Sequence, residues 1–198
     1  MIPDYQSIML PLLTAICDGK EYHSRELIEL MAERFNVSDA ERKELLASGL
    51  QSIFDNRVGW AKTYLKKSGL IESPKRAHFK ISEIGLSILD EKPKEINVKF
   101  LKRFPSFLEF QKASSNTETE LVNGTIVLDL KTPEEQIDQA YKQLREALAN
   151  ELLSKVIELS PSFFERLVVE LLVKMGYGGS IIDAGKAIGK SGDEGIDG

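Results

Sequence analysis

The last nine residues of the chain, Lys190-Ser-Gly-Asp-Glu-Gly-Ile-Asp-Gly198, form a glycine-rich acidic turn whose residue types could carry chemistry. Its two aspartates, Asp193 and Asp197, offer the oxygen ligands that hard cations prefer. Two carboxylates do not by themselves make a metal site, and an ordinary solvated turn is the other interpretation. The spacing alone leaves both interpretations open.

A helix is expected directly before this turn, over residues 161–175. Ser160 is a suitable N-cap, Pro161 fits the first helical position, and Gly176 can end the helix. One face is apolar at helical spacing and must be covered. That face consists of Phe164, Leu167, Val168, Leu171, Leu172 and Met175.

Three stretches of this region, Ser160-Pro-Ser-Phe-Phe-Glu-Arg-Leu-Val168, Met175-Gly-Tyr-Gly-Gly179 and Gly192-Asp-Glu-Gly-Ile-Asp-Gly198, resemble the start of the catalytic domain of Mrr-like restriction endonucleases. Those enzymes are nucleases of modified DNA with a PD-(D/E)xK-type fold. The resemblance implies that Asp197 is a catalytic carboxylate that binds Mg²⁺, and it makes Glu165 a second catalytic candidate. Glu165 is equally well explained as an acidic residue in the first turn of a helix, where it favours the helix dipole.

The family continues through a strand with a Gln-x-Lys or Glu-x-Lys element, which supplies another ligand and the catalytic lysine. Nothing follows Gly198 in this sequence. We therefore expect no tightly bound Mg²⁺ and no DNA hydrolysis from these 198 residues. Mg²⁺ keeps most of its waters unless several ligands converge.

A basic cluster lies in the first half of the chain. Residues 57–80 contain seven basic residues and one acidic residue, while the whole chain has a net charge of −5. The elements expected there are helices over 3–17, 24–35, 38–49 and about 53–67, then a hairpin over 70–82. Apolar residues at helical spacing predict a buried face on the first and the last of these helices. Ser24 is expected to cap the second helix, Ser38 and Glu41 to form a capping box at the third, and Ser82 to cap a further helix after the hairpin. This order is typical of a winged helix-turn-helix domain, which docks its later helix in the major groove. A basic helix followed by a basic hairpin tip favours DNA binding.

Nine residues of this region are the DNA-binding candidates. On the 53–67 helix, asparagine and arginine suit adenine and guanine edges, and lysines neutralise phosphate. On the hairpin, basic side chains would reach phosphate or the minor groove. The candidates, all expected on exposed faces, are Asn56, Arg57, Lys62, Lys66, Lys67, Lys75, Arg76, His78 and Lys80. Trp60 either packs beneath the helix or stacks on a base.

Composition excludes several other classes of protein. A single cysteine, Cys17, cannot form an intramolecular disulfide, and its apolar helical surroundings favour a structural role. With two histidines, a structural zinc site is not expected. No apolar run reaches membrane-spanning length and no secretion signal is recognised. These features favour a cytoplasmic protein.

The chain is thus expected to be mainly α-helical with a small β-hairpin. The predicted domains are a winged helix over 1–95, a packing segment and linker over 96–131, and a bridging helix with the start of an α/β restriction-endonuclease-like domain over 132–198. Within the middle segment, Pro105 is expected to break the helical pattern, the aromatic residues around it are expected to pack back on the winged helix, and residues 113–123 are the linker candidate. Thr132 is expected to cap the bridging helix. The helix 133–157 has an apolar stripe, which packs on the nuclease core or forms a homodimer seam. The expected partner is modified double-stranded DNA. A winged-helix regulator without catalysis is the alternative function.

Overall fold

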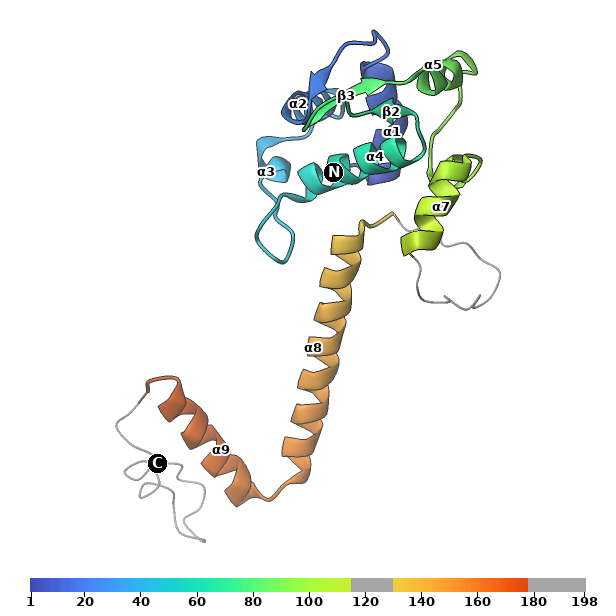
Figure 1. Ribbon diagram of the computed structural model, residues 1–198. Coiled ribbons are helices and arrows are strands. Elements are labelled where there is room, and N and C mark those ends of the chain that lie inside the picture. Colours follow the sequence, from blue (N-terminus) through green and yellow to red (C-terminus); the bar gives the residue numbers. More distant parts are fainter. Residues whose placement is uncertain (115–129, 178–198) are drawn as a thin grey trace. The chain divides into compact units, whose positions relative to one another are not determined.

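The computed structural model describes residues 1–114 and 130–177 (Figure 1). Residues 1–139 form one compact unit and the residues from Ala140 onward form a second, and each is described by itself. The described fold is mainly helical with a small antiparallel sheet, as the sequence predicts. None of the described helices is long and apolar enough to cross a membrane.

Helices α1 (Tyr5–Ala15) and α4 (Ile53–Lys67) form the centre of the first unit. Their apolar residues recur at helical spacing, so each helix has one continuous face to bury. Ile8, Leu12 and Leu13 of α1 are fully buried, as are Phe54 and Leu65 of α4. This confirms the core expected for these two helices. Cys17, just beyond α1, is exposed rather than packed in the core.

Helix α2 (Ser24–Arg34) and the short helix α3 (Asp39–Arg42) complete the helical layer. The expected capping box of α3 is confirmed: Ser38 and Glu41 bond reciprocally to each other's backbone N–H. The expected cap of α2, Ser24, is wrong by one residue. The N-cap is His23, whose Nδ1 accepts from the Arg25 N–H at 3.2 Å.

A three-stranded antiparallel sheet lies against these helices, in the order β1-β3-β2. The strands are β1 (Tyr22–His23), β2 (Ile71–Glu72) and β3 (His78–Ile81). Strands β2 and β3 are the expected hairpin, with Ile71 opposite Ile81. Strand β1 is too short to show alternation in sequence and was not expected. It pairs Tyr22 with Phe79 and His23 with His78.

Three helices follow the hairpin: α5 (Glu83–Asp90), α6 (Val98–Leu101) and α7 (Pro105–Ser114). Ser82 caps α5, as expected. Pro105 begins α7, which confirms that proline interrupts the helical pattern here. The aromatic residues of this segment pack back on α4, as expected. Phe107 is fully buried and its ring contacts the Tyr64 ring edge-on at 5.4 Å.

Helices α8 (Pro133–Glu158) and α9 (Pro161–Lys174) are the last described elements. Thr132 caps α8 as expected: its Oγ1 accepts from the Glu135 N–H, and the Glu135 carboxylate accepts from the Thr132 N–H. The expected ends of α9 are confirmed: Ser160 is at the N-cap position, Pro161 is the first helical residue, and Gly176 follows the helix with φ +90°. The expected linker 113–123 and the turn 190–198 lie wholly or largely outside the described residues.

Candidate nucleic-acid interface and catalytic residues

Asn56 does not lie on an exposed face of α4, so the expectation from the sequence is wrong for this residue. The residue is 4% exposed. Its Oδ1 accepts a hydrogen bond from Thr132 Oγ1 at 2.6 Å, and its Nδ2 donates to Gln51 Oε1 at 3.3 Å. Burial of an amide requires such partners. The amide is therefore used within the protein.

Arg57 is also engaged by the protein. Its Nη2 donates to Glu135 Oε1 at 2.7 Å, and its Nε lies 3.2 and 3.3 Å from the two Glu135 oxygens. Its Nη1 donates to the carbonyls of Ile2 and Pro3 at 2.9 and 3.0 Å. The side chains of Arg57 and Glu135 are only 17% and 12% exposed, respectively. Arg57 therefore joins three separated segments of the chain instead of projecting freely into solvent.

The pKa of Glu135 reflects this contact. Burial raises the pKa, but the hydrogen bonds from the Arg57 side chain and the Thr132 backbone, together with the charge of Arg57, outweigh burial. The pKa of Glu135 consequently lies below its ordinary value. The carboxylate is held in its charged form.

Lys62 likewise contradicts the expectation of exposure. It is 6% exposed, its ammonium group donates to Ser24 Oγ, and it lies 5.1 Å from the centre of the Phe79 ring. Burial lowers the pKa of Lys62, against an opposing effect of the Asp55 carboxylate. This lysine ties α4 to α2 and to β3.

The remaining basic candidates are accessible to solvent to differing extents. On α4, Lys66 and Lys67 are exposed, and the Lys67 ammonium lies 5.0 Å from the Phe110 ring centre. Lys75 and Arg76 are exposed in the turn between β2 and β3, called the wing below (residues 73–77). On β3, Lys80 is half-buried. The ammonium groups of Lys75 and Lys80 pair with the Glu21 and Glu72 carboxylates at 2.9 and 3.2 Å.

The two aromatic side chains considered for DNA contact, His78 and Trp60, both have partners within the protein. His78 is half-buried, its Nδ1 lies 2.9 Å from the Arg76 carbonyl oxygen, and its ring meets the His23 ring edge-on at 5.1 Å. Trp60 is half-buried and packs edge-on against Tyr64 at 5.5 Å, while its Nε1 donates to the Glu134 carboxylate. These contacts agree with packing for Trp60.

The catalytic candidates are described only in part. Glu165 is exposed on α9, but it lies beyond the first turn of that helix, so its interpretation as a first-turn acid is wrong. Asp197, the candidate metal ligand, and Asp193 lie outside the described residues. Within residues 1–114 and 130–177, no group of three or more His, Cys, Asp and Glu side chains is placed to hold a metal ion.

Both ends of the chain match known families. Residues 5–91 match the Mrr N-terminal domain, and residues 156–198 match a restriction endonuclease domain. The whole chain aligns with the type IV methyl-directed restriction enzyme EcoKMrr of Escherichia coli strain K12, at 32% identity over 212 residues. The chain belongs to the Mrr-like restriction endonuclease family. It spans 66% of that relative's length, and no solved structure matches it.

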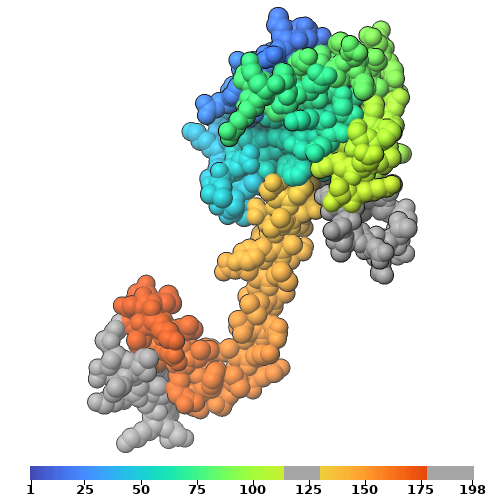
Figure 2. Space-filling model, viewed as in Figure 1, coloured from blue at the N-terminus to red at the C-terminus, as the bar shows by residue number. Residues whose placement is uncertain are grey.

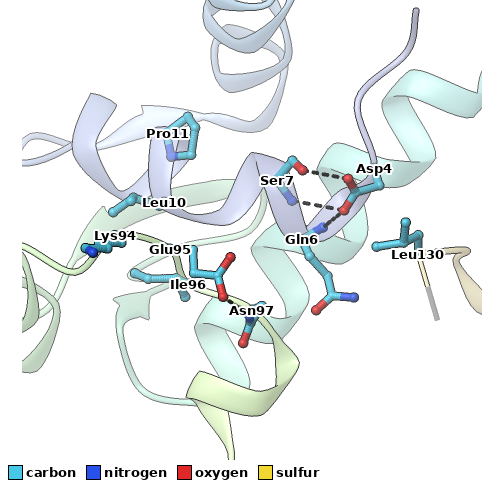
Figure 3. Close-up of a pocket in the computed structure, with 10 residues that line it drawn as sticks. All are labelled: Asp4, Gln6, Ser7, Leu10, Pro11, Lys94, Glu95, Ile96, Asn97 and Leu130. Carbon is cyan, nitrogen blue, oxygen red and sulfur yellow. Dashed lines mark hydrogen bonds between the residues drawn. The ribbon is translucent and has the colours of Figure 1, made fainter. Parts of the chain in front are cut away.

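A groove of about 360 Å³ lies between the start of α1 and residues 94–97 (Figure 3). Its polar groups serve local structure. The Asp4 carboxylate caps α1 by accepting from the N–H groups of Gln6 and Ser7, and Asn97 Nδ2 donates to Glu95. Ligand sites present a few convergent polar groups, and Asp4, Gln6, Ser7, Glu95 and Asn97 already have partners within the protein.

The sequence alone did not point to the residues at the start of α8 that meet α4. Thr132, Glu134 and Glu135 bond to Asn56, Trp60 and Arg57 respectively. The Thr-Pro-Glu-Glu run is recognisable as a helix start with two acids in its first turn. Nothing in that run identifies a partner 74 to 78 positions away.

Proposed function

We propose that this Mrr-like chain carries the DNA-recognition domain and the beginning of the catalytic domain of an endonuclease that hydrolyses modified double-stranded DNA. The proposal rests on the exposed basic side chains of the wing and of the end of α4. Lys66, Lys75 and Arg76 are all exposed. Exposed cations bind phosphate with release of counterions.

The contact residues proposed are those that the fold leaves accessible: Lys66, Lys67, Lys75, Arg76, His78 and Lys80. The ion pairs of Lys75 and Lys80 are no obstacle, because exposed pairs contribute only about 0–1 kcal/mol and exchange readily for phosphate. Asn56, Arg57 and Lys62 are not included, since their polar atoms serve the protein interior.

Salt dependence tests this surface. If four to six phosphates are neutralised, log affinity should fall with log salt with a slope of roughly −4 to −5. Lys75→Ala with Arg76→Ala should flatten the slope by up to about 2. Lys99→Ala with Lys102→Ala removes the same charge from another exposed segment and is the matched control. Equal slopes for the two double variants would remove the wing from the interface.

The relative is named as a methyl-directed enzyme, which supports modified DNA as the substrate. A titration with two duplexes of the same sequence, one methylated and one not, tests this part of the proposal. Tighter binding or selective cutting of the methylated duplex is expected. Equal binding and equal cutting would contradict it while leaving the proposed wing surface untouched.

Hydrolysis is proposed to depend on Asp197 as a Mg²⁺ ligand, with Glu165 as a further catalytic candidate. A bound Mg²⁺ supplies Lewis acidity and an activated water. The described acids do not form a metal cluster, so this proposal depends on Asp197 and on the family resemblance. Because the family's second carboxylate and lysine follow that turn, residues 1–198 alone are expected to bind DNA without cutting it.

In a protein extended through the family's lysine strand, Asp197→Ala should abolish Mg²⁺-dependent cleavage, whereas the matched change Asp193→Ala in the same turn should preserve much of it. Glu165→Ala in the same protein tests the second catalytic candidate. An extended protein that binds duplex DNA but never cuts it would favour the alternative, a DNA-binding regulator without catalysis.

The apolar stripe of α8 is proposed to be covered by the remainder of the catalytic domain, with a homodimer seam as the alternative. Its five large residues are between 54% and 70% exposed. They are Ile137, Tyr141, Leu144, Leu148 and Leu152. Sedimentation equilibrium of this chain and of the extended protein distinguishes the two. A dimer only of residues 1–198, and not of the extended protein, would mean that the rest of the catalytic domain covers the stripe.

A further inference from the structure

The start of α8 is docked on the first half of α4. We call this contact the α4–α8 junction and define it as Asn56, Arg57 and Trp60 on α4 with Thr132, Glu134 and Glu135 at the start of α8. In the space-filling view the first turns of α8 lie against the surface formed by the cyan and green segments (Figure 2). Thr132 is fully buried.

The junction leaves Arg57 no free pair of parallel donors with which to read a base. Recognition of guanine by arginine uses two parallel N–H donors. The donors of that geometry, Nε and Nη2, are directed at Glu135, and Nη1 is directed at two backbone carbonyls. The amide of Asn56 is engaged on both of its polar atoms.

Opening the junction would cost free energy, whereas the cations of the wing are already accessible to a ligand. Separating a largely buried ion pair leaves an uncompensated charge in a poorly solvated place. The cations of the wing are exposed, and Lys75 has only an exposed carboxylate as its ion-pair partner. A polyanion therefore gains more by binding the wing than by displacing Glu135.

We infer that the α4–α8 junction is a fixed joint. Asn56 and Arg57 are positioning residues that anchor the helix leading toward the catalytic residues onto the recognition helix, and the joint stays closed when the wing binds DNA. The two halves of helix α4 thus have different roles. Its first half holds α8, and its end leaves Lys66 exposed to solvent.

Two reporters show whether the joint is closed. Trp60 is the chain's single tryptophan, and its Nε1 donates to Glu134, so its emission reports on that contact. The Ala47 N–H donates to Asp138 Oδ2 at 2.8 Å, so slow hydrogen exchange of this amide reports that α8 is docked. Neither reporter uses a residue that is changed in the test.

Glu135→Ala and Thr132→Val each remove a junction contact from the α8 side and leave the core of the first unit intact. Exchange of the Ala47 amide should become faster on the order of tenfold, and Trp60 emission should shift to longer wavelength. Thr63→Val on α4 and Glu151→Ala on α8 are matched controls, since Thr63 bonds only within its helix and Glu151 pairs with Lys155 on the surface. The controls should change neither reporter. Unchanged reporters in both junction variants would overturn the inference.

Only the duplex measurements rest on the proposed function. Saturating duplex DNA should leave Ala47 exchange within about twofold of its free value. Glu135→Ala and Glu151→Ala each remove one negative charge, so they should change duplex affinity alike. Loss of Ala47 protection on duplex binding, or tighter binding by Glu135→Ala than by Glu151→Ala, would show that DNA opens the joint or recruits Arg57, and would overturn the inference.

Discussion

Helices α1 and α8 carry similar apolar stripes but meet different surroundings. In α1, Ile8, Met9 and Leu12 are fully buried, because α2, α4 and α5 pack around that helix. In α8, Ile137 and Leu144 are 68% and 70% exposed, although Glu135 and Asp138 near the start of the helix contact Arg57 and the Ala47 N–H. An apolar stripe therefore shows that a face needs cover, while the elements around it determine whether cover is present.

The largest expected difference between these regions is in the cost of truncation. Leu12→Ala should destabilise the protein by about 2–5 kcal/mol, because it opens a cavity in a fully packed core. Leu144→Ala should change stability by no more than about 0.5 kcal/mol, since little is lost at an exposed position. Urea unfolding followed by circular dichroism measures both. A large cost at Leu144 would show that this chain already covers the stripe, for example by self-association.

Two helical glycines sharpen the comparison between packed and open positions. A Cβ added at Gly85 would lie 2.2 Å from the Leu70 carbonyl oxygen and 2.7 Å from Ile81 Cγ1, so Gly85→Ala should cost about 1–3 kcal/mol. A Cβ at Gly59 meets nothing within 4 Å, so Gly59→Ala should stabilise α4 by about 0.5–1 kcal/mol. The same unfolding measurement tests the pair, and similar effects at both sites would contradict it.

The parts of the fold that depend on near neighbours were predictable from the sequence. The capping box at Ser38, the cap at Ser82 and the helix break at Pro105 each follow from residues within four positions. The buried face of α1 follows from its periodicity. Strand β1 was not predictable, since two residues carry no period and its partner lies 55 or more positions away.

The surroundings of polar side chains were not predictable for the same reason. Asn56 and Lys62 look like solvent-facing residues of a basic helix. In the structure, Asn56 is buried against Thr132. Lys62 is buried against the Phe79 ring and the Ser24 hydroxyl. These partners are distant in sequence, so no local pattern reports them. Whether Lys66, Lys75 and Arg76 contact DNA stays a prediction.

Acid should weaken the contact between the first turn of α8 and α4, because it protonates Glu135 and removes its ion pair with Arg57. Because the pKa of Glu135 is lowered in the folded protein, its stabilising contribution is present at neutral pH and is lost as pH falls below the ordinary glutamate value of about 4.3. Chemical denaturation at a series of pH values should show this loss in the parent protein. The variant Glu135→Gln should lose that part of the pH dependence, and an unchanged profile would contradict the role given to the ion pair.

The smallest expected effect distinguishes two lysines of α4. Because burial lowers the pKa of Lys62, its contribution to stability should become more favourable as pH rises toward the ordinary lysine value of about 10.4. Lys62→Met should remove this dependence and change stability at pH 7 by about 1 kcal/mol or less. The exposed Lys66→Met should leave stability and its pH dependence unchanged while weakening duplex binding. Loss of duplex affinity in Lys62→Met alone would reverse the two assignments.

The wing and strand β3, which follows it, are attached to the segment around the start of α2 at three places. Strand β1 pairs with β3, the Ser24 N–H donates to the Ala77 carbonyl at 2.8 Å, and Lys75 pairs with Glu21 at 2.9 Å. Each residue that must be ordered on binding costs about 1–2 kcal/mol of backbone entropy. A wing that is ordered beforehand avoids this cost, so more of each phosphate contact would appear as affinity. The rate of association with DNA would then depend on diffusion and charge, with no folding step to slow it.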